Sequence, residues 1–213
     1  LGLYTSLQDA NGFISSEHST TGFIPGWATK NGPSGQGTAT YAQIMLYHNY
    51  CIAAWFARLW KDKPLSEKYN ALAKTLRTNI IQHFWDDTRK AFINGYTSGG
   101  EKDNRISHHA QYWAILAGIF PEEHYINLFD EVLPAIPYYY EDISYEKGYE
   151  FMAYIKAGRL NDVLHILDNV WGNWIKQGHT RFPENFSPLA SRTQQLVFYG
   201  RPYGLSLCHG GNG

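Results

Sequence analysis

Apolar residues recur every three or four positions along most of this chain, which is the spacing of one face of an α-helix. Leu160, Val163, Leu164 and Leu167 are one such series, and Gly178 then provides the glycine that commonly ends a helix. Strand signals are short and confined to the linkers. The pattern therefore predicts an all-α fold, with helices over about residues 38–61, 64–84, 107–117, 121–134, 145–157 and 160–177.

The connections between these predicted helices alternate in length. The links at 61–64, 118–121 and 158–160 are tight, whereas the other links are longer and contain glycine, aromatic and acidic residues. A plain helix bundle would have short loops throughout. No exact sequence repeat is visible, but helix–loop–helix units recur. The alternation favours antiparallel helix hairpins arranged in a toroid, with the long loops on one face forming a site.

Composition and charge narrow the possible partners. Hydrophobic residues make up 44% of the 213 residues, which is enough for a core, but charged residues are only 17%. So low a charge suggests that helix faces are covered by something outside this chain. The net charge of −1 gives no electrostatic reason to expect nucleic acid or a membrane surface. No apolar run is long enough to span a membrane.

The segment 178–184, Gly-His-Thr-Arg-Phe-Pro-Glu, holds the most specific candidate chemistry. It places the carboxylate of Glu184 just after a helix, beside the cation Arg181 and the ring of Phe182. A sugar can stack its apolar face on rings, while a carboxylate takes a proton from water or stabilises an oxocarbenium ion. Aromatic residues form 16% of the chain, although composition alone favours a large core over a sugar pocket as the explanation.

Several stretches, in the correct order, resemble the catalytic region of bacterial α-L-rhamnosidases, which are glycoside hydrolases with an (α/α)6 barrel. Residues 171–184 are similar to the family's Trp-Gly … Gly-Ala-Thr-Thr-Phe-Trp-Glu, and residues 206–210, Ser-Leu-Cys-His-Gly, resemble its terminal Ser-x-Cys-His-Gly-Trp. Two weaker matches are residues 23–28, before a long helix, and residues 107–118, at the start of another.

The resemblance implies an inverting glycosidase in which Glu184 is the general base. It matches the family's sugar-contacting residues to Trp27 and His209, and Arg181, His109 and Trp171 are further candidates for substrate binding. The family's general acid lies upstream of the matched region. We therefore expect residues 1–213 to be a single region, a partial (α/α)6-barrel catalytic domain of a longer protein, and to be inactive alone.

Three departures from the family motif leave other functions open. Gly26, Pro183 and Gly211 stand where the family has Asp, Trp and Trp. They favour either a hydrolase for a different sugar or a non-catalytic carbohydrate-binding region that has kept the fold. His109 at a helix start could equally cap or pack, and Trp171 on a helical face could belong to the core.

The remaining expectations concern ligands and assembly. The 9 histidines show no metal-ligand spacing, so we expect neither a metal nor a cofactor. The expected partner is a rhamnose-containing glycoside, with a homodimer possible through exposed helix faces. Glu146 and Glu150 lie four apart and are expected on a solvated helix face. A bacterial periplasmic or extracellular location is slightly favoured over the cytoplasm.

Overall fold

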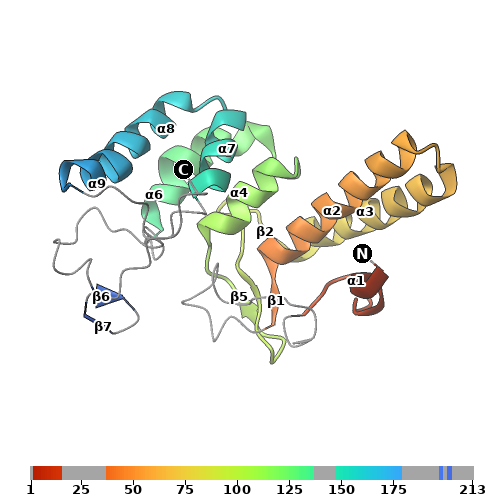
Figure 1. Ribbon diagram of the computed structural model, residues 1–213. Coiled ribbons are helices and arrows are strands. Elements are labelled where there is room, and N and C mark those ends of the chain that lie inside the picture. The colour runs from red at the N-terminus through yellow and green to blue at the C-terminus, as the bar shows by residue number, and fades with distance from the viewer. Residues whose placement is uncertain (1, 16–36, 137–146, 179–196, 199–200, 203–213) are drawn as a thin grey trace. The chain divides into compact units, whose positions relative to one another are not determined.

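The computed structural model describes residues 2–15, 37–136, 147–178, 197–198 and 201–202 (Figure 1). The chain divides into two compact units, Leu1–Ile136 and Pro137–Gly213, and each is described by itself. Helices dominate, and each strand within the described residues is two residues long. The predicted all-α class with short strands in the linkers is confirmed, whereas the single region stays a prediction.

The first unit is built on a long helix pair. After the short α1 (Gly2–Ser6), α2 (Thr40–Leu59) and α3 (Lys63–Phe84) run antiparallel and side by side (Figure 1). Their connection is tight, as predicted. Asp62 caps α3 by accepting a hydrogen bond from the Leu65 backbone N–H at 3.0 Å, which satisfies a donor that the first turn leaves open.

Two further helical segments complete the first unit. The first is α4 (His108–Leu116), and the second, after Pro121, changes its winding along its length. One predicted helix over 121–134 is observed as four consecutive turns. Pro134 has no N–H to donate to the preceding turn, and the π-helical turn lies directly before it. The turns are the 3-10 helix η2 (Glu122–His124), α5 (Tyr125–Asn127), the π-helix η3 (Leu128–Val132) and α6 (Leu133–Ala135).

The second unit contains the last predicted helix pair. Here α7 (Lys147–Lys156) is followed by α8 (Leu160–Leu167), the π-helical turn η5 (Asp168–Gly172) and α9 (Asn173–Lys176). Gly178 follows α9 with φ +81°, the left-handed conformation that ends helices. Strands β6 (Val197–Phe198) and β7 (Arg201–Pro202) pair antiparallel.

Short strands join the two helix-bearing halves of the first unit. An antiparallel sheet has the order β1 (Thr38–Ala39), β4 (Gly95–Tyr96) and β5 (Lys102–Asp103). Strands β2 (Trp85–Asp86) and β3 (Ala91–Phe92) form a hairpin after α3. Because β1 precedes α2 and β4–β5 precedes α4, the sheet holds the chain segments that enter these two helices next to each other.

The core of the first unit lies between α2, α3, the β2–β3 hairpin and α4. Phe84, at the end of α3, is fully buried and contacts the rings of Phe13 and Tyr96. Such aromatic contacts add to the stabilisation that burial alone provides. The other fully buried large side chains include Ile44, Tyr50, Leu76, Ile80, Phe92, Ile93, Ile115 and Leu128.

A second face of α2 is apolar and exposed. Ile52, Trp55, Phe56 and Leu59 follow the i, i+3, i+4, i+7 spacing and are 38–55% exposed, and Trp60 beside them is 74% exposed. In the second unit, Met152 and Ile155 of α7 and Leu160 and Leu164 of α8 are also exposed. Exposed apolar stripes of this kind are typical of surfaces that other protein covers. The homodimer stays a prediction.

The pairing of β1 with β4 depends on two glycines. A Cβ atom built on Gly95 would lie 2.2 Å from the Thr38 carbonyl oxygen, and one built on Gly37 would lie 2.2 Å from the Tyr96 carbonyl oxygen. Both glycines also have positive φ, +146° and +108°. Two backbones approach here more closely than any side chain permits.

We predict that Gly95→Ala lowers the free energy of unfolding by about 2 kcal/mol or more, because it adds both backbone strain and a clash. The matched control is Gly99→Ala in the same hairpin, whose Cβ would meet only the Thr97 hydroxyl, at 3.7 Å. That control should change stability by less than about 0.5 kcal/mol. Urea denaturation measures both variants, and equal effects would contradict the close-approach explanation.

Candidate functional site

The structure describes only part of the predicted site. Glu184, Trp27, His209 and Arg181 lie outside the described residues, as do Gly26, Pro183 and Gly211. Their proposed roles therefore stay predictions. His109 and Trp171 are described, and both are half-buried.

Trp171 packs within the second unit. Its ring lies in η5 and contacts the ring of Phe151 of α7, with 5.6 Å between the centroids. This contact fits the interpretation of Trp171 as a packing residue, although its half-exposed side chain leaves surface for a ligand. Substrate binding by Trp171 stays a prediction.

The start of α4 brings the paired histidines together with a tyrosine. Ser107 is the N-cap residue, and its hydroxyl accepts a hydrogen bond from the Ala110 backbone N–H at 3.4 Å. His108 and His109 are the first two residues of the helix. His108 Nδ1 lies 3.0 Å from the Tyr112 hydroxyl, one helical turn later. This contact orients the His108 ring. His108 is not among the substrate-binding candidates named from the sequence, which include its neighbour His109.

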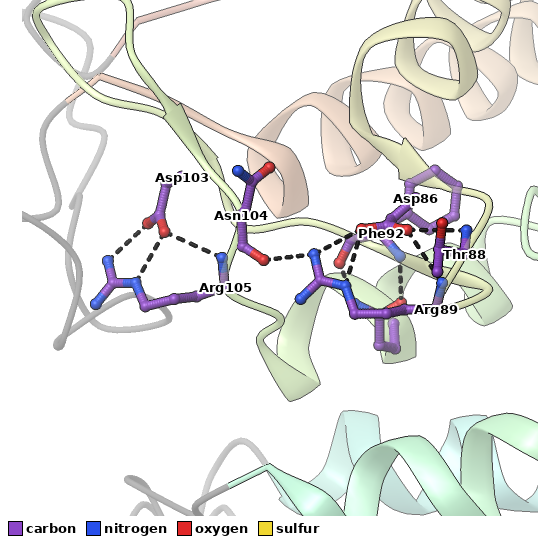
Figure 2. A network of polar contacts seen from close by, with 8 residues as sticks. Asp86, Thr88, Arg89, Phe92, Asp103, Asn104 and Arg105 are labelled. Atoms are coloured by element: carbon purple, nitrogen blue, oxygen red, sulfur yellow. Dashed lines mark hydrogen bonds and ion pairs between the residues drawn. The ribbon is translucent and has the colours of Figure 1, made fainter.

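A polar network lies at the ends of the short strands (Figure 2). Asp103 of β5 accepts hydrogen bonds from Asn94 Nδ2 at 2.7 Å and from Arg105 Nε and Nη2 at 2.8 and 2.6 Å. Burial acts to raise the pKa of Asp103, but the hydrogen bonds from Arg105 and Asn94 outweigh it and hold that pKa below its usual value. Asp103 is therefore ionised and its acceptor sites are occupied.

A second carboxylate, Asp86, holds Arg89, and Arg89 joins the β2–β3 hairpin to the strand region. Asp86 accepts the Arg89 backbone N–H at 3.0 Å and Arg89 Nε at 2.8 Å, and the backbone bond is the main reason why its pKa is lowered. Arg89 Nη2 also donates to the Asn104 carbonyl oxygen at 2.6 Å (Figure 2). A general acid needs a raised pKa. Asp86 and Asp103 are thus suited to holding loops in place and unsuited to donating a proton.

Glu150 is a correction to the sequence analysis. The expectation of a solvated face was wrong for this residue, because Glu150 is 4% exposed and bonds Lys147 Nζ at 2.7 Å. Lys147 is 6% exposed, so α7 begins with a buried ion pair. The signal in the sequence is the i, i+3 spacing of Lys147 and Glu150, which predicts an ion pair, whereas the expectation of a solvated face rested on the spacing of Glu150 to Glu146.

The described residues contain neither a cluster of metal ligands nor a membrane-spanning helix. Within them, no three histidine, cysteine, aspartate or glutamate side chains gather as a metal site would require. None of the described helices has the length and apolar character needed to cross a membrane.

Comparison with known proteins identifies the family. The family model described as Trehalase matches residues 43–159, which is more than half of the chain. The chain belongs to the Trehalase family. No protein of curated function matches it by sequence.

Two solved structures match nearly the whole of this family member. A rhamnosidase from Klebsiella oxytoca with rhamnose bound has a TM-score of 0.73 at 20% identity, and covers 97% of this chain. A GH78 family rhamnosidase of Bacillus sp. GL1 has a TM-score of 0.78 at 18% identity, and covers 99%. The chain spans only 36% and 21% of their respective lengths.

These likenesses confirm the resemblance to α-L-rhamnosidases as a resemblance of fold, and with it the helical-toroid class. The Trehalase match adds a second group of helical-toroid glycosidases. It ends at residue 159, before Glu184, and so does not bear on the predicted base.

The lowered pKa of Asp103 predicts how stability depends on pH. A carboxylate whose pKa is lower in the folded protein stabilises the fold above its unfolded pKa, and that contribution is lost as pH falls through the folded value. We expect Asp103→Asn to be less stable than the wild type at pH 7, and to lose less stability between about pH 5 and pH 2. Urea denaturation across this range tests it. Glu101→Gln, an exposed change in the same hairpin, is the control and should follow the wild-type curve.

Proposed function

We propose that this chain is part of the catalytic domain of an inverting glycoside hydrolase that cleaves terminal α-L-rhamnosides. The observation that carries the proposal is the likeness over 97–99% of the chain to two rhamnosidases, one of them with rhamnose bound. Membership of the Trehalase family supports glycoside hydrolysis more broadly.

In this proposal Glu184 is the general base that deprotonates the attacking water. It lies eight residues after Lys176, the last residue of α9, and Gly178 with its positive φ turns the chain out of that helix. The general acid comes from a segment outside these residues, about 6.5–9.5 Å from the base, which leaves room for the water of an inverting mechanism.

The substrate-binding residues in this proposal are aromatic or carry a positive or titratable group. Trp27 stacks on the sugar, and His209, Arg181 and His109 bind its hydroxyl groups. Trp171 supports the pocket wall through its contact with Phe151. A stacked ring excludes water from one sugar face, and hydrogen bonds to the hydroxyls then fix the orientation of the scissile bond.

The second candidate is a hydrolase with the same acid–base chemistry but a different sugar. The match to the Trehalase family favours it, since trehalose is a disaccharide of glucose and not a rhamnoside. Gly26, Pro183 and Gly211 depart from the sequence motifs of the rhamnosidases and favour the same candidate. Relative rates on an aryl α-L-rhamnoside, an aryl α-D-glucoside and trehalose distinguish the two candidates.

We predict that Glu184→Gln in the complete polypeptide lowers kcat by about a hundredfold to ten-thousandfold, because the amide cannot accept the proton from water. Sugar binding and thermal stability should change little, since Gln has almost the same shape as Glu. Steady-state kinetics on the preferred glycoside and calorimetric titration with the free sugar measure the two quantities.

The matched control is Glu123→Gln, which makes the same chemical change at an exposed position in η2. It should keep wild-type kcat. Near-normal turnover by Glu184→Gln would remove Glu184 from the mechanism, and sugar binding without turnover by the wild type would favour a non-catalytic carbohydrate-binding region.

A further inference from the structure

Two glutamines of the first unit make the same set of hydrogen bonds at equivalent places. Gln43 Oε1 accepts from the Ile14 backbone N–H at 2.9 Å, while its Nε2 donates to the Ile14 carbonyl at 2.8 Å and to the Ala39 carbonyl at 3.1 Å. Both Gln43 and Ile14 are buried, with exposures of 0% and 5%.

Gln111 repeats this set. Its Oε1 accepts from the Phe92 backbone N–H at 2.9 Å, and its Nε2 donates to the Phe92 carbonyl at 2.7 Å and to the Ser107 carbonyl at 3.1 Å. Gln111 is also 0% exposed. Each glutamine is the fourth residue of its helix, α2 or α4, and its second carbonyl partner belongs to the N-cap residue, Ala39 or Ser107.

The surrounding elements are equivalent as well. Each set follows a helix and a tight turn whose aspartate side chain accepts two backbone N–H groups: Asp9 from Asn11 and Phe13, and Asp86 from Thr88 and Arg89. The sequence carries a short trace of the repeat. Buried alanines precede both glutamines, in Thr40-Tyr-Ala-Gln43 and His108-His-Ala-Gln111.

We propose that Gln43 and Gln111 are two copies of one device, an amide bridge, which ties together the two ends of a loop that precedes a helix. One bridge joins Ile14 to Ala39, and the other joins Phe92 to Ser107. The loops between these ends differ in length and sequence, but the side-chain amide and its three backbone partners are the same. The structural repeat is therefore a repeat of hydrogen bonds at the two ends of each loop, which we call the loop base. Sequence similarity between the two loops is weak.

The chemistry explains why glutamine occupies both positions. A loop base needs one acceptor for a buried N–H and one donor that two carbonyl groups can share, and a primary amide supplies both in a single neutral group. An unsatisfied backbone group at these buried positions would be costly. The bridge fixes the base of each loop, so the loop itself can differ without moving the helix that follows it. The two amide bridges belong to the fold of the first unit and do not depend on the proposed activity.

In α7 the fourth residue is Glu150, which accepts a hydrogen bond from Lys147 Nζ, on the first residue of the same helix, at 2.7 Å. The buried polar group at this helix position is thus paired within the helix.

The test is site-specific hydrogen exchange in the intact protein with the variants Gln43→Met and Gln111→Met. Methionine keeps the length and burial of the side chain but removes both the acceptor and the donor. We expect Gln43→Met to speed exchange of the Ile14 amide about tenfold or more while the Phe92 amide changes little, and Gln111→Met to produce the opposite pattern. Each variant is thus the control for the other.

Faster exchange at both amides in each variant would show a general loss of packing and overturn the proposal, as would unchanged exchange at the amide whose acceptor was removed. Should a methionine variant fail to fold, exchange in the wild-type protein takes its place. The Ile14 and Phe92 amides should then exchange as slowly as the amides inside α2 and α4, and fast exchange at either amide would contradict the bridge. Backbone exchange reports these outcomes whether or not the protein hydrolyses a glycoside.

Discussion

The first unit depends on one kind of interaction, in which a buried glutamine amide bonds the two ends of a loop. Gln43 ties the start of α2 to Ile14, and Gln111 ties the start of α4 to Phe92 of β3. The β1–β4 pairing, with Gly37 and Gly95 in close backbone approach, then joins the two loop bases. Long connections can leave and return at this end without disturbing the helices, which is what a toroid needs if its loops are to carry a site.

Two described carboxylates of the first unit hold the fold together, and the proposed chemistry is assigned to other residues. Asp86 and Asp103 are held ionised by arginines and backbone N–H groups, and Arg89, the partner of Asp86, fastens the hairpin to the end of β5 through the Asn104 carbonyl oxygen. Their lowered pKa values make both unsuited to donating a proton. The proposed chemistry is instead assigned to Glu184 and to a general acid from a segment upstream of this chain.

Much of the fold could be predicted from the sequence, because the apolar spacing of the long helices follows directly from burial of one face. The π-helical turns Leu128–Val132 and Asp168–Gly172 could not, since the apolar spacing continues through them. Glu150 was misplaced because its partner, Lys147, satisfies the charge that would otherwise keep it in water. The roles of Gln43 and Gln111 could not be predicted, because a single polar residue in an apolar helix has no spacing pattern that indicates its partners. Of the candidate site, the sequence named His109 but not the His108–Tyr112 contact beside it.

The mechanism proposed for Glu184 requires hydrolysis of a glycoside by inversion, with a carboxylate as the base. Proton NMR of the sugar first released from an aryl α-L-rhamnoside by the complete polypeptide, before mutarotation, tests this requirement. Inversion releases the β-anomer first. Initial release of the α-anomer would show retention and contradict the assignment of a general base, and with it the mechanism proposed for Glu184.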